Sequence, residues 1–162
     1  MKRLLLVLAA VSLASPVLAA GGAEKGQGAI VIRDDAPVYD SHAGDEIQYR
    51  LGRGDPVAGT MGGAAAFFGG VHRGMCMFDE KGGRLHVAYL EAGKKVSRSG
   101  WMSPADLSKF TYESCGQSCS PFMVKNFTNR WNVCFEEAKD NKLDRLRPLW
   151  AQEDAAKAAN QA

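Results

Sequence analysis

The chain has 162 residues, of which 46% are apolar and 23% are charged. This length fits one small domain, or one domain with an appendage, and excludes a large multidomain enzyme. The apolar content is that of a globular chain and argues against wholesale disorder. The formal net charge is only +2, so the chain as a whole has no strong attraction to nucleic acid or to an anionic membrane surface.

The N-terminal segment has the three parts of a secretory signal peptide. Lys2 and Arg3 give a positive start, an apolar run covers Leu4–Ala14, and small residues follow. We expect a signal peptide over 1–20, cleaved near Ala19–Gly21, and a mature chain that is periplasmic or secreted. The apolar run is shorter than the roughly 20 residues of a membrane-spanning helix. An uncleaved anchor is the alternative; no membrane span is expected in the mature chain.

Short apolar or alternating segments, separated by glycine-rich turns, fill the middle of the chain. Ser103 and Pro104 are typical of the cap and first position of a tight helical turn over Ser103–Leu107. Five or six short strands at this spacing predict a small β-barrel or sandwich. The extended segments are expected at Ala29–Ile32, Val38–Tyr39, Ile47–Leu51, Val57–Gly59, Val71–Phe78, Arg84–Leu90 and Val96–Met102, with Phe110 and Tyr112 closing the region.

The pattern becomes helical after Cys115. A helix beginning at Ser120-Pro121 would place Phe127 and Trp131 on the face of Ala138, and these aromatic rings would need cover from the β region. We therefore expect a mainly β fold followed by an α-helix that packs on it; docking of this helix on a partner subunit is an alternative. The predicted boundaries are a signal peptide 1–20, a flexible lead-in 21–28, a β-barrel 29–112, a disulfide-tethered helical extension 113–150 and a disordered tail 151–162.

All four cysteines lie after the predicted signal peptide, at Cys76, Cys115, Cys119 and Cys134. An even number in an oxidising compartment predicts two disulfides. An unbroken helix over 121–138 would place Cys134 ~20 Å from the helix start, too far to reach Cys119, and a bridge from Cys115 to Cys134 would need a fully extended return of the chain. This favours Cys76–Cys134 with Cys115–Cys119. A helix break near Asn126 would leave the other pairings open.

The competing hypothesis for these cysteines is a thiol-redox or metal-handling protein. It would use Cys115 and Cys119, together with Cys76 or His72. The two cysteines are separated by three residues and no second short pair is present, so the pattern is a weak match to a zinc site. The sequence therefore predicts no bound metal or other cofactor.

Four segments, taken in order, resemble the bacterial SH3-like (SH3b) domain. They are Ala36–Asp40 as the first strand into a long loop, Leu51–Val57 as the turn into the second strand, Arg84–Tyr89 as an edge strand, and Gly100–Leu107 as the closing strand and helical turn. The resemblance implies a small SH3-like barrel and a non-catalytic module that binds a peptide, a protein or a cell-envelope component. The cysteine-bearing helix lies outside the pattern.

A surface of this kind needs exposed aromatic side chains, because stacking on an extended ligand does not require a deep pocket. Tyr39, beside Asp40 and an open loop, is the first candidate for a ligand contact. The predicted ligand-binding residues are Tyr39, Asp40, Tyr49, Tyr89 and Trp101, with core packing as the alternative for Tyr89 and Trp101. The histidines have no spacing suited to a triad, and no catalytic motif is present, so we expect no enzyme activity.

Overall fold

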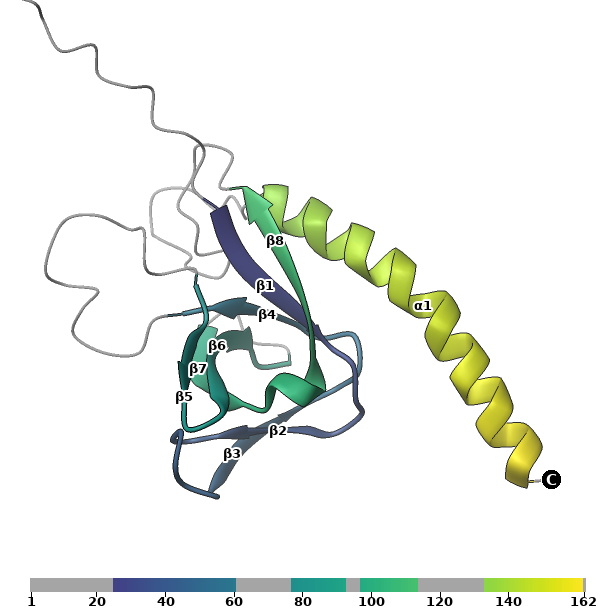
Figure 1. The fold of residues 1–162 in the computed structure, drawn as a ribbon, viewed down its shortest axis with the longest axis horizontal. Helices are drawn as coiled ribbons and strands as arrows, with labels where there is room; N and C mark the ends of the chain where they lie inside the picture. Colours follow the sequence, from purple (N-terminus) through teal and green to yellow (C-terminus); the bar gives the residue numbers. More distant parts are fainter. Residues whose placement is uncertain (1–24, 61–76, 93–96, 114–132, 162) are drawn as a thin grey trace, which may run out of the picture.

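The computed structural model describes residues 25–60, 77–92, 97–113 and 133–161. These residues form eight strands, one short 3-10 helix and a C-terminal α-helix (Figure 1). The elements are β1 (Lys25–Val31), β2 (Ala36–Tyr39), β3 (Ile47–Leu51), β4 (Pro56–Gly59), β5 (Asp79–Lys81), β6 (Arg84–Leu90), β7 (Ser97–Met102), η3 (Pro104–Asp106), β8 (Leu107–Glu113) and α1 (Val133–Gln161). The prediction of a mainly β fold with a helix packed on it is confirmed.

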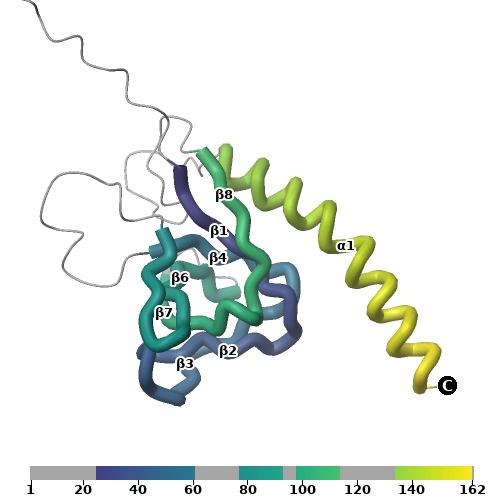
Figure 2. Tube along the Cα trace, viewed as in Figure 1, coloured from purple at the N-terminus to yellow at the C-terminus, as the bar shows by residue number. Residues whose placement is uncertain are grey.

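All described strand pairs are antiparallel, and they form one sheet with the order β3-β2-β7-β6-β4-β1-β8. Strand β5 also pairs with β6. Among the described strands, β3 and β8 end this order and do not pair with each other. The described strands of the predicted β-barrel or sandwich thus form a sheet that is not closed. Strand β3 pairs only with β2 and is mostly exposed, while α1 packs on β8 and β1 (Figure 2).

The core lies on one face of this sheet, because side chains alternate along each strand. In β6, Leu85, Val87 and Tyr89 are buried, while the residues between them are half-buried. This agrees with the extended segment that the sequence predicts over Arg84–Leu90. The buried cluster is made of Ala29, Val31, Ala36, Val38, Leu51, Val57, Leu85, Val87, Tyr89, Met102 and Leu107.

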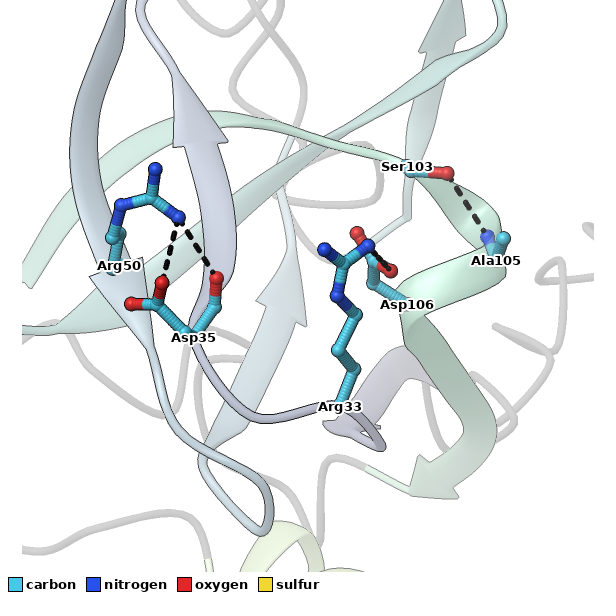
Figure 3. A network of polar contacts seen from close by, with 6 residues as sticks. All are labelled: Arg33, Asp35, Arg50, Ser103, Ala105 and Asp106. Atoms are coloured by element: carbon cyan, nitrogen blue, oxygen red, sulfur yellow. Dashed lines mark hydrogen bonds and ion pairs between the residues drawn. The ribbon is translucent and has the colours of Figure 1, made fainter.

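Polar contacts hold the connections around this core (Figure 3). The predicted helical turn is η3, where the Ala105 N–H donates to the hydroxyl of Ser103 at 3.2 Å. Asp106, at the end of η3, is only 5% exposed and pairs with Arg33 at 3.3 Å. The buried carboxylate thus has a cation as partner, which offsets the free energy of its desolvation.

Strand β1 begins earlier than expected. The predicted lead-in 21–28 is wrong from Lys25 onwards, because this strand pairs with β8 from Lys25 to Val31. The glycine-rich sequence is typical of a linker, but in β1 glycine is needed because neighbouring rings leave no room for a side chain. A Cβ atom on Gly28 would lie 2.5 Å from the Phe110 ring and 2.9 Å from the Phe135 ring. Glycine therefore allows α1 to approach the sheet.

A second apolar cluster joins α1 to the sheet. Phe135 is fully buried and contacts the Tyr112 ring edge-on, with ring centroids 5.0 Å apart. The ring centroids of Phe110 and Phe135 are 5.5 Å apart. Burial raises the pKa of Tyr112 well above its ordinary value of 10.0. The phenol of Tyr112 therefore stays neutral, which suits the apolar contact between the helix and the sheet.

Helix α1 continues through Pro148 to Gln161, so the predicted disordered tail over 151–162 is wrong for the described residues up to 161. Two features account for this. Alanine, which makes up half of residues 151–162, is the best helix former. In addition, Arg53 bonds both carboxylate oxygens of Asp154, at 3.1 and 2.7 Å, and ties the helix to the β3–β4 turn.

Several predictions concern residues outside the described part of the chain. These are the signal peptide, the extended segment as far as 76, the start of the helix, and three of the cysteines, Cys76, Cys115 and Cys119. Cys134, near the start of α1, is bonded in a disulfide rather than free. The predicted pairing remains a prediction. Among the described residues, no helix has the length and apolar character needed to cross a membrane.

Candidate functional site

A row of aromatic and imidazole side chains crosses the face of the sheet opposite the core. Tyr39 on β2 lies directly across from Trp101 on β7, and Trp101 lies directly across from His86 on β6. Directly opposed residues of neighbouring strands project from the same face. All three side chains are half-buried. We call Tyr39, Trp101 and His86 the ring row.

The rings of the row contact one another and a further imidazole. The ring centroids of His86 and Trp101 are 4.7 Å apart. His42, from the β2–β3 loop, meets the indole edge-on at 5.3 Å. Tilted and edge-on geometries at these distances are favourable for aromatic pairs. The indole of Trp101 is therefore in contact with two imidazoles.

Arg84 fixes the loop that borders the row. Its guanidinium carbon lies 3.6 Å from the centre of the Tyr39 ring. The same group donates to the backbone oxygens of Ser41, at 3.0 Å, and of Gly44, and pairs with Asp45 at 3.1 Å. A cation on a π face, with oxygens at its edge, is a favourable arrangement. The loop over 40–46 is thereby positioned beside the row.

The electrostatics of His86 favour its neutral form. Its Nδ1 lies 3.1 Å from the backbone oxygen of Thr60, and a carbonyl can only accept, so Nδ1 carries the proton. Burial lowers the pKa of His86, and this effect exceeds the opposing influences of the Thr60 carbonyl and of Asp79. Asp79 lies directly opposite His86 on β5 and extends the line of the row by one strand.

Of the predicted ligand-binding residues, Tyr39 and Trp101 are brought together in this row. Asp40 is exposed at the start of the loop, where its backbone N–H donates to the backbone oxygen of Glu46 at 3.1 Å. Tyr89 is 1% exposed and belongs to the core. The position of Tyr89 matches the core-packing alternative rather than a ligand contact.

Tyr49 also packs toward the core rather than toward the row. Its ring stacks on Tyr89, with centroids 5.3 Å apart and an interplanar angle of 22°. Its hydroxyl accepts a hydrogen bond from the Ala92 N–H at 3.0 Å. Two of the five candidates thus lie on the core side of the sheet.

Sequence reasoning missed three residues of the site: His42, Arg84 and His86. The alternation in β6 placed Arg84 and His86 on the face opposite Leu85, which is a usable signal. It could not show which strands lie beside β6. The contact of Arg84 with Tyr39 depends on the order β2-β7-β6, which joins segments far apart in the sequence.

Elsewhere, the surface offers less specific features. A pocket of about 310 Å³ lies against β1 and β8, where Phe78, Lys109 and Phe110 are among its lining residues. Within residues 25–60, 77–92, 97–113 and 133–161, no group of three or more His, Cys, Asp or Glu side chains is placed to hold a metal ion. The ring row is the better-organised surface.

No protein family model matches the chain, and neither do any curated proteins or solved structures.

Proposed function

We propose that the protein is an exported, non-catalytic binding module whose ring row holds an extended peptide segment of a protein or cell-envelope component. One observation carries this proposal. Tyr39, Trp101 and His86 are in register across three neighbouring strands, on the face opposite the main buried cluster. Half-buried rings in this position have a fixed orientation and keep part of their surface exposed.

The dimensions of the row suit an extended chain. Neighbouring strands lie about 4.8 Å apart, so the row spans roughly 10 Å from Tyr39 to His86. An extended peptide advances about 3.3 Å per residue, so about three residues cover this distance. Aromatic contacts of this kind contribute roughly 1 kcal/mol each beyond the buried area.

The order of the elements supports the SH3-like resemblance on which the proposal draws. The four segments of the resemblance lie on β2, on the turn from β3 to β4, on β6 and on the pair β7–η3, in that order along the chain. Trp101 and the turn after it occupy the place of the closing strand and helical turn in that resemblance. The charged, apolar and small-residue pattern of residues 1–20 supports export.

The test begins with a random decapeptide display library, panned on the mature protein purified from the periplasm. The enriched peptides are then measured by titration calorimetry against wild type, Trp101→Leu and Trp150→Leu. Leucine keeps an apolar side chain and removes the ring. We expect Trp101→Leu to weaken binding about tenfold, which corresponds to about 1.4 kcal/mol.

The matched control is Trp150→Leu, because Trp150 lies on α1 beside Arg53 and away from the row. It should leave the affinity unchanged. Failure to enrich any peptide would contradict the proposal, and so would equal weakening by both variants. Co-sedimentation with purified peptidoglycan sacculi shows whether the enriched peptides compete with a cell-wall component.

A further inference from the structure

We propose that the ring row recognises a cationic side chain of the peptide, an ammonium or a guanidinium, which lies against Trp101 and pairs with Asp79. This inference rests on the proposed function and names the chemical group that the surface selects. Three observations support the inference. They are the position of Asp79, the contact of Arg84 with the Tyr39 ring, and the carboxylates of the loop beside the row.

Asp79 stands at the end of the line formed by the row. It is directly opposite His86, and His86 is directly opposite Trp101. Within the part of the chain that the structure describes, Asp79 forms no ion pair. Its side chain is half-buried, so the carboxylate is partly removed from water without the cation that commonly accompanies this.

The other end of the row already holds a cation. The guanidinium of Arg84 lies on the Tyr39 ring and pairs with Asp45. A ring face next to a carboxylate is thus a combination that this surface uses to hold positive charge. Trp101 on β7 and Asp79 on β5 offer the same two kinds of group, one on each side of His86. Tryptophan is the strongest π partner for a cation.

The bordering loop adds to the preference for positive charge. Residues 40–46 contain three carboxylates and no lysine or arginine. Only Asp45 of these is paired with a cation among the described residues, through Arg84. His86 is held neutral by its burial, so it does not oppose an incoming cation. The net field beside the row is therefore negative and complementary to an ammonium or guanidinium.

The test uses one lysine-containing peptide from the enriched set and the same peptide with acetyl-lysine in place of lysine. Acetylation removes the charge and retains most of the side chain. Both peptides are titrated against wild type, Asp79→Asn and the control Glu80→Gln. Glu80 is exposed and lies opposite Leu85, a core residue, so it stands outside the line of the row.

We expect acetylation to weaken binding about tenfold in wild type and in Glu80→Gln, and to have little effect in Asp79→Asn. Such non-additivity assigns the lysine contact to Asp79. An equal effect of acetylation in all three proteins would overturn the inference, and so would an enriched set without lysine or arginine. Both results would leave peptide binding standing, whereas absence of any binding would overturn the proposed function as well.

Discussion

Trp101 and His86 lie directly opposite each other on β7 and β6, and their ring centroids are 4.7 Å apart. The contact links two neighbouring strands on the side of the sheet away from the core. His86 donates from Nδ1 to Thr60, which fixes the plane of its ring and, through the contact, supports the indole. Trp101 is therefore presented in a defined orientation rather than as a freely rotating surface ring.

This relationship makes folding stability depend on pH through His86. Its pKa is lowered in the folded protein, from an ordinary value of 6.5, mainly by burial. The unfolded chain then binds the proton more readily, so stability is greatest above about pH 6.5 and falls as the pH drops toward the lowered value. The nearby carboxylate of Asp79 on β5 and the Thr60 carbonyl reduce the effect without reversing it.

The measurement is urea unfolding of wild type and His86→Gln at pH 7.5, 6.5 and 5.5. Wild type should lose stability over this range, and the variant should lose less. Identical pH profiles for the two proteins would show that His86 is as easily protonated in the folded state as in the unfolded chain.

The packing of α1 against the sheet should be disturbed by a single added methyl group, and the protein should lose stability as a result. In Gly28→Ala the new Cβ would meet the rings of Phe110 and Phe135 at 2.5 and 2.9 Å, closer than carbon atoms approach. We expect a loss of roughly 1–3 kcal/mol in the free energy of unfolding, typical of overpacking.

The control for this prediction is Gly52→Ala, where the nearest atom to the new Cβ is an Asp55 oxygen at an ordinary 3.6 Å. Chemical denaturation compares the two variants with wild type. Equal stability of both variants would contradict the close packing of Phe135 against β1.

The C-terminal half of α1 should become less protected when its ion pair is removed. Arg53 bonds Asp154 and lies over the Trp150 ring, with 5.4 Å from the guanidinium carbon to the ring centre. Both charged groups are solvent-accessible, so we expect Asp154→Asn to leave global stability almost unchanged. Its amide exchange over 150–161, followed by mass spectrometry, should become faster.

The comparison is Asp144→Asn, which removes a pair with Arg147 within the same helix. It should leave exchange over 150–161 unchanged. The bond to Arg53 lowers the pKa of Asp154 below its ordinary 3.8, so the contact should persist at pH 4 and weaken only as the pH falls through the lowered value. Equal exchange in both variants would show that the ion pair does not hold the helix.

The cysteines should all resist alkylation without reductant. We expect the intact mass of the periplasmic protein to be lower by four hydrogens than that of the reduced form, because four cysteines form two disulfides. Ready alkylation of Cys115 and Cys119, or a metal that co-purifies, would favour the thiol-redox or metal-handling alternative. Mapping of the bridges by proteolysis tests the predicted Cys76–Cys134 pairing.

The parts of the fold that the sequence predicted well are those determined by neighbouring residues. Alternation in β6 identified the buried face, and Ser103-Pro104 identified the helical turn before β8. Gly82 and Gly83, in one of the glycine-rich turns that separate the predicted strands, have φ values of 58° and 74°, which glycine adopts without strain.

The parts of the fold that the sequence did not predict depend on contacts between residues far apart in the chain. Glycines in β1 look like a linker until the rings of β8 and α1 are placed against them. Residues 151–161 are all exposed, and their link to the sheet comes from Arg53 on a distant turn. The ring row likewise needs the strand order, which no local pattern of Tyr39, Trp101 or His86 contains.

The central claim, that a peptide binds on the ring row, is tested most directly by the indole N–H signals in a ¹⁵N–¹H spectrum. The Trp101 and Trp150 signals are assigned from the leucine variants, and an enriched peptide is then titrated into wild type. We predict that the Trp101 signal shifts with the calorimetric affinity while the Trp150 signal stays in place. A bound peptide that leaves the Trp101 signal unmoved would contradict the claim.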